Sequence, residues 1–224
     1  MERELVITED GSATLRHNQT GECYHSTFGA YSESMHIFIN HGLHSILCTK
    51  AEKINIFEVG LGTGLNCLLS AVTADSFPSK QFEYIAVEKY PLTGSEYKKL
   101  NYNLLVNDEY HSVWDKIHLC EWHFNTELLP NFTLHKIHGD IRDVAIERSD
   151  INLVYYDAFS PGNQPELWSK DIFKSVRSLM SSNSLLVTYS SKGDVKEALR
   201  FAGFRIQRVP GPSGKRHMII AHID

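Results

Sequence analysis

The segment 54–66 combines the residue types and spacing that point most directly to chemistry. A short apolar run leads to Glu58, and three alternating glycines follow at Gly60, Gly62 and Gly64. Glycine is needed where the backbone takes a positive φ or where a ligand must lie against bare main chain, and a helix start beside it offers free N–H groups. The segment therefore predicts a strand, a tight turn and a helix N-terminus that cradle a nucleotide-type cofactor. The alternative is a glycine-rich turn that binds nothing.

The spacing narrows the choice of cofactor. A dinucleotide-binding turn reads G-x-G-x-x-G and a P-loop ends in G-K-[ST], whereas here Gly64 follows Gly62 by two positions and precedes Leu65. The carboxylate of Glu58 would repel a pyrophosphate but attract the amino group and sulfonium of S-adenosylmethionine. The pattern E-x-G-x-G-x-G resembles motif I of class I methyltransferases. This resemblance implies that S-adenosylmethionine is the cofactor and that Asn66 binds it together with Glu58 and the glycines.

Three more acidic residues follow apolar runs, at Glu88, Asp140 and Asp157. Glu88 lies at the distance past the glycines where a βαβ unit places its ribose-binding carboxylate; an exposed strand-end glutamate is the alternative. Asp140 could accept a hydrogen bond from the adenine amino group or cap a helix at 141–147. Because parallel strands end at one edge of a sheet, we expect these acids and Glu58 to form one site, with Asp157 also at the cofactor.

Strands and helices are expected to alternate along the chain. We predict strands at 54–59, 82–88, 132–138, 151–157, 184–189, 204–209 and 217–223, and helices at 32–39, 65–74, 93–107, 111–129, 141–147, 165–180 and 194–202. The segment 4–16 has a hairpin pattern around Asp10 and Gly11, and the helix at 32–39 is expected to begin at a serine cap. This order predicts an α/β, Rossmann-like fold with a mostly parallel seven-stranded sheet, a C-terminal antiparallel hairpin and an N-terminal hairpin extension. We expect an extension at 1–50 packed on a single catalytic domain at 51–224.

The loop after the fourth expected strand carries a more specific pattern. It reads D-A-F-S-P from Asp157, and P-E-L-W follows from Pro165 to Trp168. With the segments 32–38 and 214–218, this sequence resembles the MnmC-type tRNA methyltransferases. These enzymes methylate 5-aminomethyl-2-thiouridine at the wobble position to its 5-methylaminomethyl form. Two positions depart from the family pattern: Met35 replaces the usual arginine and His217 replaces an acid.

The resemblance implies roles for the loop residues. Asp157 is expected to orient the substrate amine and take its proton, and Phe159 to wall the base and restrict water. The substrate and RNA contacts are expected at Ser160, Pro161, Trp168, Lys215 and Arg216. Trp168 could stack on the flipped uridine or belong to the core. The family also occurs fused to an FAD-dependent oxidase, and the resemblance favours a standalone methyltransferase whose aminomethyl substrate comes from separate enzymes.

Composition and charge limit the other functions. No apolar run reaches the length of about 18 residues that a membrane helix needs, and the N-terminus lacks a signal-peptide pattern, so we expect a cytoplasmic protein without membrane contact. The four cysteines form no CxxC pair, and neither His41 nor His44 has a third ligand nearby, so no metal is expected. The net charge is −5, but the segment 192–217 is basic and could bind the phosphates of a tRNA anticodon stem. An ordinary solvated surface is the alternative for that segment.

Two other functions fit the same pattern. One is a methyltransferase or aminopropyltransferase that acts on a small-molecule amine, which would not depend on RNA. The other is an RNA-binding scaffold that has kept the cofactor fold without activity.

Overall fold

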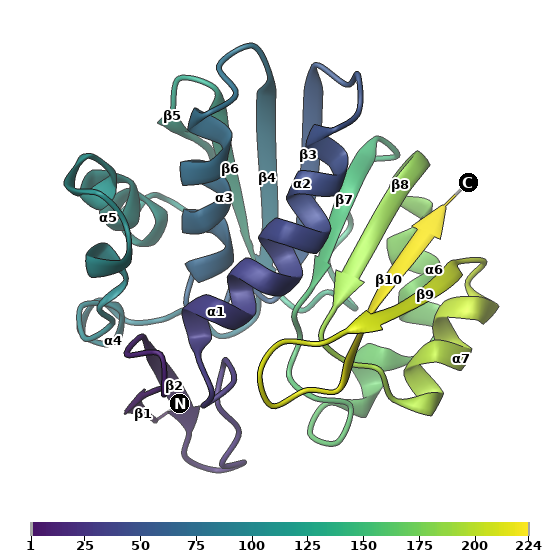
Figure 1. The fold of residues 1–224 in the computed structure, drawn as a ribbon, viewed down its shortest axis with the longest axis horizontal. Coiled ribbons are helices and arrows are strands. Elements are labelled where there is room, and N and C mark those ends of the chain that lie inside the picture. Colours follow the sequence, from purple (N-terminus) through teal and green to yellow (C-terminus); the bar gives the residue numbers. More distant parts are fainter. Residues whose placement is uncertain (1, 224) are drawn as a thin grey trace.

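The computed structural model describes residues 2–223, in which a central sheet is covered by helices on both faces (Figure 1). The sheet holds eight strands in the spatial order β5 (Asn125–Leu129), β6 (Phe132–His138), β4 (Gln81–Glu88), β3 (Lys53–Val59), β7 (Ile151–Tyr156), β8 (Met180–Thr188), β10 (His217–Ile223) and β9 (Arg205–Pro210). The five strands from β6 to β8 are parallel, whereas β5, β10 and β9 run antiparallel to their neighbours. The α/β class, the mostly parallel sheet and the C-terminal hairpin are confirmed.

The parallel strands are apolar on both faces because both faces are covered. In β3, Ile54 and Ile56 join one core cluster while Phe57 and Val59 join the other. Adjacent side chains of a strand point to opposite faces, so a continuous apolar run serves both layers. All seven expected strands are present, and β5 is an eighth that was not predicted.

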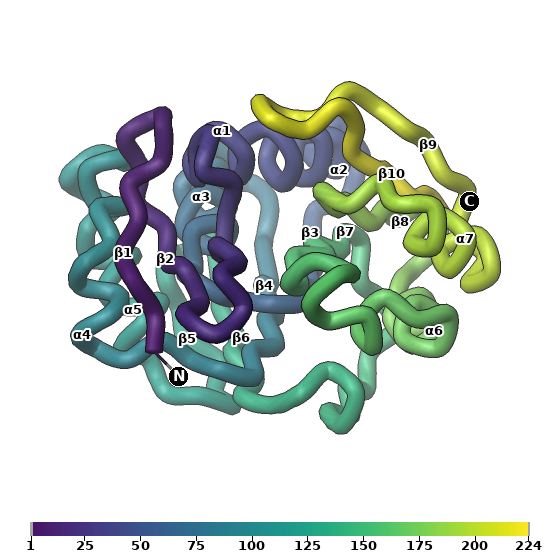
Figure 2. Tube along the Cα trace, turned by 90° about the horizontal axis from the view of Figure 1, so that it is seen from below, coloured from purple at the N-terminus to yellow at the C-terminus, as the bar shows by residue number. Residues whose placement is uncertain are grey.

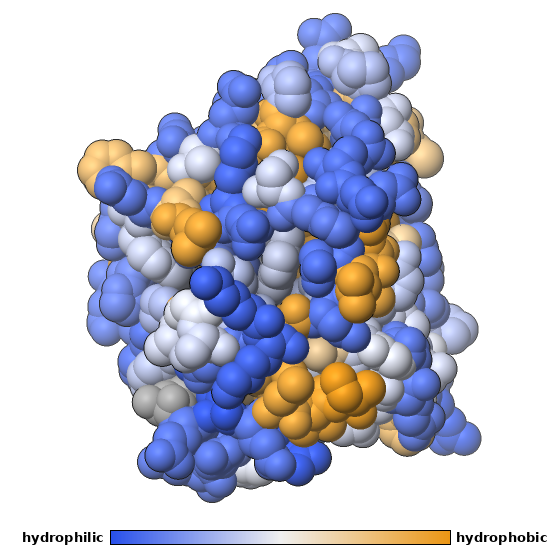
Figure 3. Space-filling view, turned by 90° about the vertical axis from the view of Figure 1, so that its left-hand side faces the viewer, coloured by the Kyte–Doolittle hydropathy of each residue, from blue (hydrophilic) through white to orange (hydrophobic). Residues whose placement is uncertain are grey.

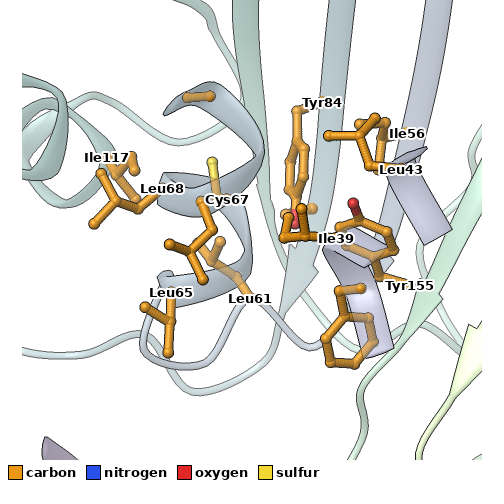
Figure 4. Packing of buried hydrophobic residues seen from close by; sticks show 14 of the residues in the cluster. Ile39, Leu43, Ile56, Leu61, Leu65, Cys67, Leu68, Tyr84, Ile117 and Tyr155 are labelled. Atoms are coloured by element: carbon orange, nitrogen blue, oxygen red, sulfur yellow. The ribbon is translucent and has the colours of Figure 1, made fainter. Parts of the chain in front are cut away.

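One long helix and two shorter ones cover the first face of the sheet. The long helix comprises α1 (Ala30–Ser34), the π-helical segment η1 (Met35–Leu43) and α2 (His44–Leu47), and α3 (Leu65–Asp75) and α5 (His111–Leu119) lie beside it. Figure 4 shows Ile39 and Leu43 of η1 facing Tyr84 and Tyr155 of the sheet. This packing fixes the helix that follows the N-terminal hairpin on the sheet.

The expected serine cap at residue 32 is wrong, because the helix begins two residues earlier. The hairpin supplies the cap: Ser12 Oγ accepts from the backbone N–H of Ala30 at 3.1 Å, and Asp10 accepts from that of Ser32 at 2.9 Å. Burial opposes ionisation of Asp10, but its hydrogen bonds with Ser12, Ser32 and Thr8 outweigh this and lower its pKa to about 2. A negative charge at a helix N-terminus also matches the helix dipole.

The second face is covered by η4 (Pro165–Trp168), α6 (Lys170–Ser178) and α7 (Gly193–Phe201). The helix expected at 141–147 is absent and that prediction is wrong. Only one turn forms, in which Asp143 and Val144 donate to the carbonyl of Asp140. After this turn the chain is extended, so that Val144 and Ile146 both point toward the sheet and pack on it. Residues two apart share a face in an extended chain but not in a helix.

The helices expected at 93–107 and 111–129 are both shorter than predicted. The first is replaced by α4 (Gly94–Tyr97), η2 (Tyr102–Leu105) and η3 (Asp108–Tyr110). Asn101 lies between these pieces and exchanges hydrogen bonds with the hairpin at Ala13 and Gly11. The second ends at Leu119, where the buried Lys136 ammonium donates to the carbonyl of Ile117 at 2.7 Å, and the chain then enters β5.

The N-terminal hairpin lies at the carboxyl ends of the parallel strands. It comprises β1 (Arg3–Ile7) and β2 (Ala13–His17), as expected, and it lies at the lower edge of the sheet in Figure 1. Figure 2 looks onto this edge and shows the N-terminal segment crossing it. Arg3 pairs with Glu96 at 3.0 Å, which ties the hairpin to the domain.

The face over the hairpin and α5 is mostly hydrophilic, with separate apolar patches (Figure 3). Exposed apolar side chains of this kind are normal on folded domains. None of the helices in the part of the chain that the structure describes is long and apolar enough to cross a membrane.

Candidate active site

A cavity of about 500 Å³ lies at the carboxyl edge of the sheet. Its walls come from the ends of β3, β4, β6 and β7, from residues 22–28 and Glu33 of the N-terminal extension, and from Gly214 and Lys215 of the β9–β10 loop. The expected acids Glu88, Asp140 and Asp157 line it, whereas Glu58 does not. One site therefore forms where the strand order predicted it.

The three glycines of the turn after β3 are all in the left-handed region. Gly60, Gly62 and Gly64 have φ values of 90°, 54° and 79°. A Cβ on Gly60 would lie 2.8 Å from the carbonyl oxygen of Asp157, and one on Gly62 would lie 3.0 Å from the Tyr24 ring. A side chain here would therefore strain the backbone and fill the space beside the cavity floor.

Asn66 links two acids at the start of α3. Its Nδ2 donates to Glu58 Oε1 and to Asp157 Oδ2, both at 2.9 Å. Glu58 is fully buried, and burial raises its pKa well above the ordinary value, with a further contribution from the charge of Asp157. Glu58 thus meets the cavity only through Asn66, which corrects the expectation that its carboxylate faces a ligand directly.

Asp157 combines burial with access to the cavity. Burial and, to a lesser extent, the charge of Glu33 raise its pKa, the hydrogen bond from Asn66 and the charge of Lys215 oppose the rise, and the pKa that results is about 7. A carboxyl group with a pKa near neutrality can hold or release a proton at physiological pH, as a general base or acid must.

Glu88 and Asp140 hold different parts of the cavity rim. Glu88 accepts from the backbone N–H of Gly62 at 2.8 Å and from that of Tyr90 at 2.7 Å, so it braces the glycine turn. Asp140 accepts from Arg142 Nη2 at 2.6 Å and pairs with Lys89 at 3.0 Å. The hydrogen bonds from Arg142 lower the pKa of Asp140 below its usual range.

The loop after β7 is held from both sides. Phe159 lines the cavity and meets the Tyr24 ring edge-on, with the ring centroids 4.9 Å apart. Ser160 also lines the cavity, and its backbone N–H donates to Glu22 at 2.7 Å, whereas Pro161 is half-buried outside the lining. Trp168 is buried and donates from Nε1 to the Phe159 carbonyl at 2.8 Å, so it supports the loop from the core. Of the two roles considered for Trp168, its burial supports the core position and not a contact with the substrate.

The C-terminal residues divide between the cavity and the outer surface. Lys215 lines the cavity, whereas Arg216 is exposed outside it. His217 faces basic neighbours: desolvation and the charges of Arg208 and Arg216 lower its pKa. Met35 packs on the core cluster and does not reach the cavity.

The N-terminal segment contributes residues to which the sequence analysis gave no role in the site. Glu22 holds the loop at Ser160, Tyr24 covers Gly62, and Glu33 lies beside Lys215. No local motif marks Glu22 or Tyr24, because their role depends on the hairpin folding back over the strand ends.

Comparison with known proteins identifies the chain by family. Residues 106–224 match the family described as S-adenosyl-L-methionine-dependent methyltransferase. The chain belongs to this family. It is a methyltransferase that uses S-adenosylmethionine, as the glycine turn predicted.

Individual relatives agree with this assignment. The methyltransferase is 30% identical over 233 residues to the tRNA 5-methylaminomethyl-2-thiouridine biosynthesis bifunctional protein MnmC of Burkholderia mallei, covering 96% of this chain and 34% of the relative. A Burkholderia pseudomallei MnmC gives the same identity over 236 residues, with 96% and 35% covered. The chain thus spans about a third of the length of these relatives. The crystal structure of MnmC2 from Aquifex aeolicus superposes with a TM-score of 0.78 at 26% identity, covering all of this chain and 71% of that one.

The residues present fit this cofactor. Gly60 and Gly62 line the cavity with bare main chain, and the acids at the rim can accept hydrogen bonds from hydroxyl and amino groups. The described residues include no group of three or more His, Cys, Asp or Glu side chains that could hold a metal ion.

The raised pKa of Asp157 predicts an effect on stability. Its pKa lies at about 7 in the folded chain against an ordinary value of 3.8. The unfolded chain therefore loses the proton more readily than the folded chain, and the free energy of unfolding falls as pH rises from about 4 to about 7. Replacing Asp157 by Asn removes that loss of stability. We expect the variant to be more stable than the wild type above about pH 7 by about 1 to 3 kcal/mol, a range reduced because solvent screens this half-buried group.

Thermal or urea unfolding of the cofactor-free chain measures this difference across pH. The gain should vanish below about pH 3, where both the folded and the unfolded wild type bind the proton. Asp115→Asn, an exposed change on α5, is the matched control and should show no such trend. A stability difference that stays constant with pH would contradict the raised pKa.

Proposed function

We propose that this methyltransferase N-methylates 5-aminomethyl(-2-thio)uridine at the tRNA wobble position to 5-methylaminomethyl(-2-thio)uridine. The names of the MnmC relatives refer to biosynthesis of this nucleoside, and the similarity covers 96% of the present chain. The observation that carries the proposal is Asp157, a carboxyl with a pKa of about 7 at the wall of the cavity. An amine substrate needs such a group, because its protonated form has no lone pair to react.

The turn and the strand-end acids are proposed to bind the cofactor. Gly60 and Gly62 line the cavity and let the cofactor approach the main chain, whereas Gly64 faces Ile117 and His118 of α5 and only shapes the turn. Glu88 accepts from the ribose hydroxyls, and Asp140 lies where the adenine amino group is expected. Glu58 does not line the cavity; it accepts from Asn66, which in turn holds Asp157 at the cavity wall. When bound, S-adenosylmethionine supplies an electrophilic methyl group that an amine displaces from the sulfonium.

Asp157 and Phe159 are proposed to act on the substrate amine. The Oδ2 atom of Asp157 is held by Asn66, so Oδ1 is the atom that accepts the amine proton. Phe159 is held between Tyr24 and the Trp168 hydrogen bond and excludes water from the amine. Fixing the amine and the base in one geometry supplies much of the rate acceleration expected of such an enzyme.

The rim and the basic C-terminal segment are proposed to bind the tRNA anticodon stem-loop. Ser160 and Pro161 belong to the loop at the cavity mouth, and Lys192 Nζ lies next to Gly162 of that loop. Arg216 is exposed beside His217 and Arg208. Positive side chains around a cavity mouth attract phosphates and make binding salt-dependent.

Several further points belong to this proposal. Separate enzymes supply the aminomethyl substrate, the chemistry takes place in the cytoplasm without membrane contact, and no metal takes part. Residues 1–50 form an extension that packs on the catalytic domain of residues 51–224.

Transfer of labelled methyl to a panel of acceptors tests the proposed substrate. We expect label on tRNA that carries 5-aminomethyl(-2-thio)uridine and none on unmodified tRNA or spermidine. Label on spermidine alone would show a small-amine transferase. Cofactor binding without transfer to any acceptor would show a non-catalytic scaffold.

A further inference from the structure

Glu33 and Lys215 form an ion pair at the cavity wall, although they lie far apart in the sequence. Lys215 Nζ bonds to Glu33 Oε1, and Glu33 Oε2 accepts from the backbone N–H of Ser26 at 2.7 Å. The Glu33 side chain is 7% exposed and the Lys215 side chain 30% exposed. Both residues line the cavity, so a charge pair connects α1 to the β9–β10 loop beside the reacting groups.

The position of the Lys215 ammonium is fixed by its surroundings. It lies 4.0 Å from the centroid of the Tyr189 ring, and the Tyr189 hydroxyl donates to the carbonyl of Ala158 at 2.9 Å. Gly214, just before Lys215, has a φ of 79°, and Phe28 packs so closely that a Cβ at Gly214 would overlap its ring. A cation held over an aromatic ring and against a buried carboxylate has little freedom to move.

Charged and polar groups act on Asp157 from several elements. Glu33 approaches from α1 and Lys215 from the β9–β10 loop, while Asn66 approaches from α3 with Glu58 behind it. Tyr189 follows β8 and is neutral, because burial raises its pKa well above the ordinary value. Glu33 and Lys215 act on Asp157 in opposite directions, so their balance decides how readily Asp157 ionises.

We propose that Glu33 and Lys215 are positioning residues that hold one positive charge beside Asp157 and thereby set the protonation of Asp157 and of the substrate amine. The inference rests on the proposed amine substrate. Neither residue takes part in bond making.

The charge of Lys215 helps the reaction in two ways. It favours the ionised form of Asp157, and it disfavours the protonated form of a nearby amine. The amine proton then moves to Asp157 Oδ1 and the nitrogen keeps its lone pair. Glu33 holds Lys215 in place, and its own negative charge opposes ionisation of Asp157 while the Lys215 charge favours it.

Titration of the Asp157 carboxyl tests this directly. Chain labelled with ¹³C-aspartate is followed by carboxyl NMR against pH, with Asp157→Asn used to assign the signal. We expect the midpoint to rise by about 1 pH unit in Lys215→Met and to fall by about 1 unit in Glu33→Gln. Lys215→Arg keeps the charge and should stay near the wild type, and the double variant Glu33→Gln/Lys215→Met should also return toward it.

The exposed pair of Lys170 and Glu197 provides matched controls. It joins the same two residue types outside the cavity lining, so Lys170→Met and Glu197→Gln should leave the Asp157 midpoint unchanged. The double variant has no unpaired buried charge, which keeps the test valid if a single variant folds poorly. Midpoints that do not move, or that move in the same direction in both single variants, would overturn the inference.

The pH profile of kcat/KM on the aminomethyl tRNA gives the second readout. Its acidic limb should move up in Lys215→Met and down in Glu33→Gln, together with the NMR midpoints. The NMR titration needs no RNA, so shifted midpoints in a chain that does not methylate tRNA would remove the proposed substrate and leave the role of the pair standing.

Discussion

Replacing Asp157 by Ala is expected to lower methyl transfer by about 100- to 10,000-fold, the range typical for loss of a general base. The carboxyl is held by Asn66 at the cavity wall and has a pKa of about 7, so it can accept the amine proton near neutral pH. Cofactor affinity should change by no more than a few-fold, because the glycine turn and Glu88 remain in place.

Single-turnover kinetics and calorimetry separate these two effects. Asp115→Ala is the control, since Asp115 is exposed on α5 and lies outside the cavity lining. The methyl-transfer rate of the wild-type enzyme should increase as pH rises through about 7, because the ionised form of Asp157 is the base. Normal turnover in Asp157→Ala would remove Asp157 from the mechanism.

Replacing Gly62 by Val is expected to abolish cofactor binding. Gly62 has a φ of 54°, and a Cβ there would lie 3.0 Å from the Tyr24 ring. A left-handed conformation costs a non-glycine residue about 1 to 2 kcal/mol, and a β-branched side chain adds to the crowding. The turn would move, and the 2.8 Å bond from the Gly62 N–H to Glu88 would be lost.

Calorimetric titration with S-adenosylmethionine measures this loss, which we expect to exceed about 100-fold on the basis of the lost contacts. Gly94→Val is the matched control, because Gly94 has no positive φ and a Cβ added there would meet no neighbouring atom within 4 Å. An unchanged affinity in Gly62→Val would refute the role of the turn.

The sequence predicted the sheet and the place of the site because both depend on local patterns. Apolar runs that end in Glu58, Glu88 and Asp157 indicated the strand ends, and parallel strands bring their ends together. The glycine spacing predicted the turn because positive φ is a local requirement, and all three glycines have it.

The features that the sequence did not predict depend on contacts between segments that lie far apart in the chain. A local pattern could not show that Asp10 and Ser12 cap the helix at Ala30, or that Lys136 ends α5. The roles of Glu22 and Tyr24 likewise depend on how the hairpin lies over the strand ends. Trp168 had two possible roles because a tryptophan early in a helix fits both; its burial places it in the core, where it donates to the Phe159 carbonyl.

Identification of the methylated nucleoside tests the central claim most directly. After incubation of the chain with S-adenosylmethionine and tRNA that carries 5-aminomethyl(-2-thio)uridine, the anticodon fragment is isolated, digested and analysed by mass spectrometry. The account predicts that the wobble nucleoside gains one methyl group and co-elutes with 5-methylaminomethyl(-2-thio)uridine, and that Asp157→Ala leaves it unmodified. A methyl group at another nucleoside, or an unchanged wobble position with the wild-type chain, would contradict it.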